Sequence, residues 1–122
     1  MELEFRIVWR RSVAVVYCRG RLIYGEDTRE LGRALRHLLE SSKQVVLQLA
    51  AVSQIDSGGV GELGAAYLAA HRRDAEISMA SLSPRVSEVL RITGLEQLFQ
   101  IHPSEEEAVE AFLLPAAMQK AG

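Results

Sequence analysis

The amino-acid sequence predicts an α/β fold, with a mixed β-sheet of four to five strands and about four helices packed against it. Two observations lead to this prediction: short apolar or alternating stretches recur along the chain, and segments with helical spacing of apolar residues separate most of them. The 122 residues suffice for one hydrophobic core. Because no linker, repeat or low-complexity segment divides the chain, we expect one domain over residues 1–115 and a disordered tail over residues 116–122.

The first two predicted strands form a hairpin. Residues 3–10 alternate apolar with charged side chains, which is typical of a half-buried strand, and residues 13–19 form an apolar stretch. Only Arg11 and Ser12 separate the two, so an antiparallel hairpin is the simplest connection.

A helix and a third strand follow. Residues 20–25 lead into the helix, where Asp27 with Glu30 resembles a capping box. Five apolar residues then keep helical spacing: Leu31, Ala34, Leu35, Leu38 and Leu39. The next strand covers Gln44–Leu49, and the strand–helix–strand order favours parallel pairing of the two strands that flank the helix.

The second half of the chain repeats this alternation. Serine or proline residues mark the predicted helix starts, and glycine or proline residues mark the ends. We expect a helix over about Ser57–Arg73, a strand over Glu76–Ala80, a helix from Ser83-Pro84 to Gly94, a strand over Leu98–His102, and a last helix that starts with a capping box at Ser104, runs through Phe112 and is ended by Pro115.

Charge and composition exclude several classes of partner. Lysine and arginine number 14 and aspartate and glutamate 16, so the net charge of −2 gives no electrostatic footprint for nucleic acid or an anionic membrane surface. Glu2 and Glu4 stand where a signal peptide is basic, and no apolar run reaches the roughly 18 residues of a membrane span. We expect a cytoplasmic protein with no direct membrane insertion. The one cysteine, Cys18, excludes a disulfide within the chain.

The chemistry concentrates at the junction Ile55–Leu63, where an apolar strand gives way to a glycine-rich helix. Ser57 stands at the first helical turn, where unpaired N–H groups and the helix dipole favour an anion, so a phosphate on Ser57 would be well placed. The junction also lies at the carboxyl edge of the predicted sheet, the usual place for sites in α/β folds. The simpler interpretation is that Ser57 or Asp56 only caps the helix.

Small residues follow Ser57. Gly58 and Gly59 each cost about 1 kcal/mol relative to alanine inside a helix, so keeping both indicates that something approaches the backbone closely. Glycine and alanine continue along the helix, as Gly61, Gly64, Ala65, Ala66, Ala69 and Ala70. This stripe predicts either close packing inside the domain or a flat docking surface near Ser57.

No catalytic, metal or cofactor site is predicted. His37, His71 and His102 lie more than 30 positions apart and outside any metal-ligand spacing. The P-loop and dinucleotide signatures are absent, and Ile55 stands where a Gly-x-Ser-x-Gly hydrolase motif requires glycine. We therefore expect a protein that is not an enzyme, and a hydrolase with Ser57 as nucleophile is only a remote alternative.

The segment Asp56–Gly61 resembles the Asp-Ser-Ser/Thr-Gly-Leu-Gly signature of STAS domains, specifically the stand-alone bacterial anti-sigma factor antagonists. Three further segments resemble this family in the right order: Gly20–Leu22, Leu82–Phe99 and Ser104–Ala108. Together these segments span nearly the whole chain. Gly58 stands where the family usually has a second hydroxyl residue.

The resemblance implies a STAS-type fold and a switch. An ATP-dependent serine kinase with a histidine-kinase-like ATPase fold, which is also an anti-sigma factor, would phosphorylate Ser57. The unphosphorylated antagonist would bind this kinase and free the sigma factor, the phosphorylated form would release it, and a serine phosphatase would reset the cycle.

The resemblance also implies a contact surface. Its predicted partner-binding residues are Leu22, Tyr24, Asp56, Ser57, Gly58, Gly59, Val60 and Gly61. For Asp56 two roles stay open, a helix cap or a group that orients Ser57 towards the kinase. The alternative function is a non-enzymatic STAS accessory subunit of a membrane transport ATPase.

Overall fold

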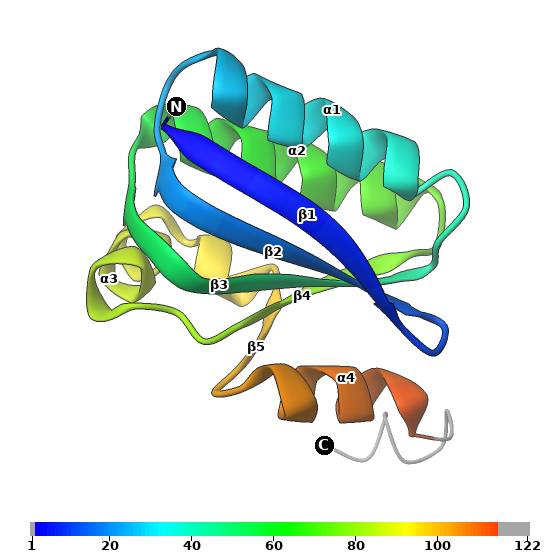
Figure 1. Ribbon diagram of the computed structural model, residues 1–122. Helices are drawn as coiled ribbons and strands as arrows, with labels where there is room; N and C mark the ends of the chain where they lie inside the picture. The colour runs from blue at the N-terminus through cyan, green and yellow to red at the C-terminus, as the bar shows by residue number, and fades with distance from the viewer. Residues whose placement is uncertain (1, 115–122) are drawn as a thin grey trace.

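In the computed structural model, which describes residues 2–114, five strands form one mixed sheet (Figure 1). Their order in the sheet follows the chain, and β1 is antiparallel to β2 while all other neighbours are parallel. The elements are β1 (Leu3–Arg10), β2 (Val13–Leu22), α1 (Glu26–Leu38), β3 (Gln44–Ile55), α2 (Ser57–Arg72), β4 (Glu76–Ala80), α3 (Pro84–Thr93), the 3-10 helix η1 (Leu95–Gln97), β5 (Gln100–His102) and α4 (Glu105–Leu113). The predicted fold class is confirmed.

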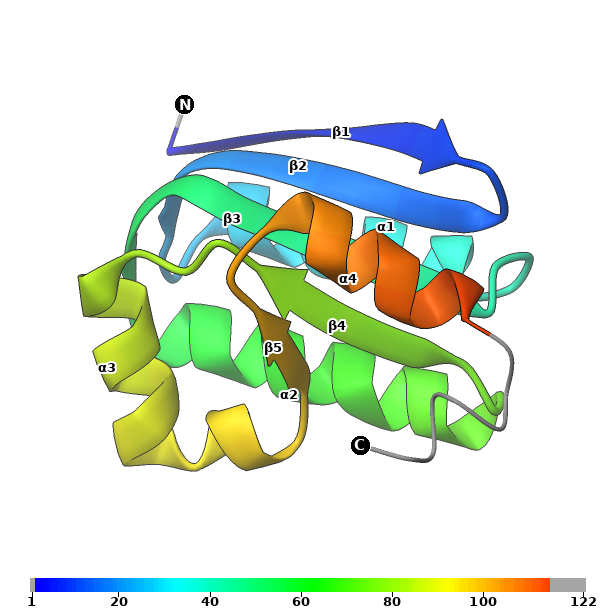
Figure 2. The ribbon, with the colours of Figure 1, turned by 90° about the horizontal axis from the view of Figure 1, so that it is seen from below.

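Helices cover both faces of the sheet (Figures 1 and 2). α1 and α2 lie side by side on one face, where Leu35 of α1 and Leu63 of α2 are buried in the main core. α4 lies on the opposite face, where Ala108 and Phe112 form a smaller core with Val13, Val15, Val46 and Ala80. α3 lies at one end of the sheet and adds Val86 and Leu90 to the main core.

The predicted β1–β2 hairpin is confirmed, and β2 runs further than expected. All eight residues of β1 pair with β2 without a register shift, and Arg11 in the turn has φ +56°. β2 continues to Leu22, where the sequence predicted a link after residue 19. Gly20 allows this extension, because its φ is +118° and a Cβ there would lie 2.2 Å from the backbone oxygen of Glu2.

The capping box predicted at the start of α1 is wrong. α1 begins at Glu26, and no side chain caps its first turn. Asp27 instead accepts hydrogen bonds from the backbone N–H groups of Glu2 (2.9 Å) and Leu3 (3.3 Å). The carboxylate thus fixes the start of β1 against α1, a contact between segments that local spacing cannot predict.

β3 passes its predicted end at Leu49 and continues to Ile55. Its second half buries only Val52 and Ile55, at a spacing of three residues instead of two. Two register shifts against β2, between Tyr17 and Arg19 and between Gly20 and Arg21, disturb the alternation. These irregularities explain why the sequence pattern did not predict the extension.

The ends of the later helices follow their local signals. Ser83 accepts from the N–H of Val86 at 3.3 Å and Ser104 from that of Glu107 at 3.2 Å, so both predicted caps are confirmed. Gly94 ends α3 with φ +79°. The predicted end at Pro115 and the predicted tail lie outside the described residues. Within residues 2–114, every helix is too short or too polar to cross a membrane.

Candidate functional site

Asp56 holds the junction between β3 and α2. Its Oδ1 accepts hydrogen bonds from the N–H groups of Gly58 (2.8 Å) and Gly59 (3.2 Å), which makes Asp56 the N-cap of α2. The N–H of Tyr24 donates to both carboxylate oxygens, at 2.9 and 3.0 Å. These backbone donors, Tyr24 foremost, lower the pKa of the Asp56 carboxyl below its ordinary value, although desolvation opposes them. One carboxylate therefore joins the start of α2 to the segment that precedes α1.

The close approach predicted at the two glycines comes from the chain itself. A Cβ at Gly58 would lie 2.6 Å from the Cα of Tyr24, and a Cβ at Gly59 would lie 2.2 Å from the backbone oxygen of Leu22. That same Leu22 oxygen accepts a hydrogen bond from the N–H of Asp56 at 3.1 Å. Gly58 and Gly59 thus let the segment 22–24 pack directly on the first turn of α2.

Ser57 is the first residue of α2, and its side chain takes no part in holding the junction. The residue is exposed, and within residues 2–114 its hydroxyl has no hydrogen-bond partner. Asp56 accounts for this. A cap at Ser57 would accept from the N–H groups of Gly59 and Val60, and these already donate to the carboxylate (3.2 Å) and to the backbone oxygen (2.9 Å) of Asp56. The Ser57 hydroxyl can therefore be modified without the loss of a contact.

Ser57 lies in a shallow groove of about 310 Å³ between the starts of α1 and α2. Its lining residues are Tyr24, Gly25, Thr28, Arg29, Ser57, Gly58, Gly61 and Glu62. Tyr24 is 78% exposed, and the Arg29 guanidinium lies 5.6 Å from the centroid of its ring. Arg29 also forms an ion pair with Glu26 at 3.1 Å, and Glu62 forms one with Arg36 at 3.4 Å. The groove combines an exposed aromatic ring with one arginine and one glutamate.

The structure divides the predicted contact residues into a surface and its support. Tyr24, Ser57 and Gly61 are exposed, whereas Asp56, Gly58 and Val60 are half-buried. Leu22 is fully buried and Gly59 is buried, so neither can touch a partner directly. Both instead shape the junction from beneath, since each belongs to the close contact between segment 22–24 and α2.

Sequence reasoning missed the α1 side of the groove. Thr28 and Arg29 line it, yet neither carries a motif of its own. Helical spacing could have found Arg29. It lies one helical turn after Gly25, the neighbour of the predicted contact residue Tyr24, so a helix that starts here places Arg29 near Tyr24.

The small residues of α2 have two different surroundings. Ala66 and Ala70 are buried against the domain, so the predicted close packing is confirmed for this side of the helix. A Cβ at Gly61 or Gly64 would have no neighbour within 4 Å. The open side of the helix begins at the Ser57 groove, which Gly61 lines.

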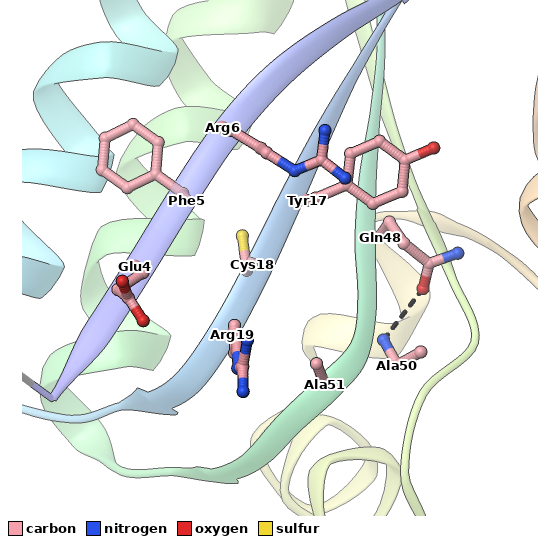
Figure 3. Close-up of a pocket in the computed structure, with 9 residues that line it drawn as sticks. All are labelled: Glu4, Phe5, Arg6, Tyr17, Cys18, Arg19, Gln48, Ala50 and Ala51. Atoms are coloured by element: carbon pink, nitrogen blue, oxygen red, sulfur yellow. Dashed lines mark hydrogen bonds between the residues drawn. The ribbon is translucent and has the colours of Figure 1, made fainter.

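A larger groove, of about 600 Å³, lies across β1, β2 and β3 (Figure 3). Arg6, Arg19, Tyr17 and Gln48 are among its lining residues, and the Arg6 guanidinium lies 4.8 Å from the centroid of the Tyr17 ring. None of the predicted site residues lines this groove, so the candidate site is the one at Ser57. Among the described residues, no three His, Cys, Asp or Glu side chains gather as a metal site requires.

Comparison with known proteins agrees with this fold. The family model described as STAS domain matches residues 5–108. An anti-sigma factor antagonist from Mycobacterium paratuberculosis shares 22% identity with a TM-score of 0.77, over 89% of this chain and 92% of that one. An anti-sigma-factor antagonist (STAS) domain protein from Planctomyces limnophilus shares 17% with a TM-score of 0.79, over 90% and 98%. Unphosphorylated SpoIIAA, a Bacillus protein, shares 19% with a TM-score of 0.75, over 88% and 94%.

Proposed function

Since this chain belongs to the STAS domain family, we propose that it is an anti-sigma factor antagonist whose partner binding is switched by phosphorylation of Ser57. The unphosphorylated chain binds an anti-sigma factor that is also an ATP-dependent serine kinase with a histidine-kinase-like ATPase fold. Phosphorylation of Ser57 releases this partner, and a serine phosphatase restores the binding form. The chain acts as a binding module and not as a catalyst.

The observation that carries this proposal is the exposed, unbonded hydroxyl of Ser57 beside a cap that is already complete. Asp56 accepts from the N–H groups of Gly58 and Gly59, so folding needs nothing from the Ser57 side chain. A kinase can reach the hydroxyl because Ser57 is exposed at the edge of an open groove. A Ser57 side chain that capped the helix would instead accept from the N–H groups of Gly59 and Val60, which already donate to Asp56.

The same geometry explains how a phosphate would act. The seat for an anion at the start of α2 is occupied by the Asp56 carboxylate. A phosphoryl group on Ser57 brings a charge of about −1.5 to −2, and the adjacent carboxylate repels it from the helix end. The phosphate therefore projects towards the groove and the partner. Desolvation and repulsion at the contact surface then oppose binding without refolding of the domain.

The test is a pull-down from the source cytoplasm with wild type and Ser57→Asp side by side. Ser12→Asp is the matched control, because Ser12 is an exposed serine in the β1–β2 turn and outside the groove. We expect wild type and the control to retain a histidine-kinase-like ATPase and Ser57→Asp to lose it. Equal retention by all three proteins would contradict the proposal.

The alternative, an accessory subunit of a membrane transport ATPase, is not favoured. The three structures named above, with TM-scores of 0.75 to 0.79, are described as anti-sigma factor antagonists, whereas a SulP transporter STAS domain and a sulfate transporter family protein match with TM-scores of 0.69 and 0.68. Retention of one transport ATPase by wild type and by Ser57→Asp would reverse this preference.

A further inference from the structure

The outer edge of β1 is long, regular and uncovered. Within residues 2–114 the sheet ends at β1, and Figure 2 shows no element packed beyond it. β1 has eight residues, no proline and no register shift against β2, whereas the opposite edge strand, β5, has three residues. Long, flat edges are templates for pairing with another strand, and shortening, proline, bulges or charged side chains are the usual protection. β5 is protected by its short length, whereas the protection of β1 is limited to three charged side chains, Glu4, Arg6 and Arg10.

The backbone groups on this edge belong to the odd-numbered residues. The N–H of Arg21 donates to the oxygen of Glu2 at 2.8 Å, so this pair is hydrogen-bonded. In an antiparallel ladder, hydrogen-bonded and non-hydrogen-bonded pairs alternate. The even-numbered residues of β1 therefore direct their N–H and C=O groups towards β2. Phe5, Ile7 and Trp9 direct theirs outwards, to the open edge.

The odd- and even-numbered side chains of β1 lie on opposite faces of the sheet. Phe5 packs against the main core on the α1 face, and alternation assigns Ile7 and Trp9 to the same face. Ile7 and Trp9 are 40% and 53% exposed although they are large and apolar, and Trp9 also borders a groove lined by α4. Alternation puts Glu4, Arg6, Val8 and Arg10 on the α4 face, where the larger groove includes Glu4 and Arg6 (Figure 3). The edge thus carries one apolar row and one charged row.

We propose that a second copy of this chain pairs with β1 in an antiparallel, two-fold symmetric arrangement with Ile7 on the axis. In this register the residues whose backbone N–H and C=O groups face the open edge pair only with each other. Ile7 pairs with Ile7 of the second copy, and Phe5 pairs with Trp9 of the second copy. This register forms about six backbone hydrogen bonds. The two sheets then join through β1 into one continuous sheet.

The charged row disfavours the two neighbouring symmetric registers. With Ile7 on the axis, Glu4 lies opposite Arg10 of the second copy on both sides, and Arg6 lies opposite Val8. These are non-hydrogen-bonded pairs, in which side chains approach most closely. Arg10 already donates to Glu105 (3.0 Å) and Tyr17 (2.9 Å) of its own chain, so Glu4 would be a further acceptor for it.

A shift of the axis to Arg6 would put two Arg6 side chains opposite each other, and a shift to Val8 would put Arg6 opposite Arg10. Like charges directly opposite each other destabilise a pair of strands. An axis at Phe5 would also pair opposite charges, Glu4 with Arg6, but it needs the Leu3 N–H, which already donates to Asp27.

This interface is separate from the Ser57 groove, because none of the residues that line the groove belongs to β1. The two proposals can therefore fail independently.

The test is disulfide trapping at the predicted axis. In Ile7→Cys the two Cα atoms would lie about 5.5 Å apart, within the reach of a disulfide. Trp9→Cys is the matched control, because it lies on the same face and is similarly exposed, but its two Cα atoms would lie at least about 13 Å apart along the strands. The native Cys18 is 2% exposed, and burial raises its thiol pKa to about 12, so it should contribute little background.

We expect mild oxidation to convert Ile7→Cys to a covalent dimer and to leave Trp9→Cys largely monomeric. Equal yields for the two variants would overturn the proposed register. For wild type, light scattering should show a mass that rises from monomer to dimer with concentration. A monomer at every accessible concentration would overturn the proposal itself.

A charge variant tests the register without a cysteine. Glu4→Arg puts two arginines opposite each other on both sides of the axis, and it breaks no ion pair of Glu4 within residues 2–114. We expect self-association to weaken about tenfold. Glu88→Arg makes the same charge change on α3, far from the edge, and should self-associate as wild type does. An unchanged dimer in Glu4→Arg would contradict the pairing of Glu4 with Arg10.

Discussion

Glycines in the first turn of α2 and glycines further along the same helix should respond to alanine in opposite directions. Alanine in place of glycine stabilises a helix by at most about 1 kcal/mol. At Gly61 and Gly64 the added Cβ has no neighbour within 4 Å, so most of this gain should appear as stability. At Gly58 and Gly59 we expect alanine to lower the stability instead, because segment 22–24 packs closely against both residues.

The reversal follows from the atoms that the new Cβ would meet. At Gly58 these are the Cα and N of Tyr24, at 2.6 and 2.8 Å, and the hydrogen bonds from Tyr24 N–H to Asp56 hold that backbone in place. Overpacking of this kind costs about 1–3 kcal/mol. After the gain of about 1 kcal/mol from replacing glycine in a helix is subtracted, we expect Gly58→Ala to be about 1 kcal/mol less stable than wild type. At Gly59 the obstacle is the Leu22 oxygen at 2.2 Å, so we expect a cost at the upper end of this range and a net loss of about 2 kcal/mol.

Urea unfolding followed by circular dichroism measures these differences directly. Thermal unfolding should agree, at roughly 4 °C per kcal/mol for a domain of this size. Gly61→Ala is the matched control, since it makes the same chemical change in the same helix. If Gly58→Ala gained as much stability as Gly61→Ala, the close packing of Tyr24 on α2 would be refuted.

Three further predictions concern single side chains. Ser57→Ala should change the free energy of unfolding by no more than about 0.5 kcal/mol, and a larger loss in urea unfolding would mean that the hydroxyl helps to hold the junction. Asp56→Asn should make the free energy of unfolding less dependent on pH below about pH 5. The pKa of Asp56 is lowered by folding, so its contribution is complete above the ordinary value near 4 and is lost as the pH falls through the lower folded value. A wild-type urea midpoint that fell no more steeply below pH 5 than that of the variant would contradict this. Asp27→Ala should speed hydrogen exchange at the Leu3 amide, and unchanged exchange would dismiss the contact between Asp27 and β1.

Short sequence patterns, such as helix caps and helix-ending glycines, correctly predicted where the later helices begin and end. Ser83 and Gly94 bound α3 as expected, because a cap and a left-handed glycine act within one turn. Asp27 shows the limit, since its spacing to Glu30 resembled a cap while its carboxylate binds the backbone of Glu2 and Leu3. The choice between those partners depends on where β1 lies, and local spacing does not contain that information.

The candidate site was predicted to a similar extent. The sequence predicted the strand-to-helix junction and the positions of Asp56 and Ser57 at the start of α2, because a helix start is determined by residues adjacent in the chain. The burial of Leu22 was not predicted, since it follows from the register of β2 against β3, which shifts just before it. Arg29 was missed for a related reason: it reaches the groove only because α1 packs beside α2.

The measurement that tests the central claim most directly is the affinity of this chain for the ATPase that we expect wild type to retain, before and after enzymatic phosphorylation of Ser57. Isothermal titration with both forms, and with Ser57→Ala carried through the same kinase treatment, gives the comparison. We predict that phosphorylation weakens binding at least about a hundredfold, and that Ser57→Ala keeps the affinity of the untreated chain. Equal affinity of the phosphorylated and unphosphorylated forms would contradict the proposal that Ser57 is the switch.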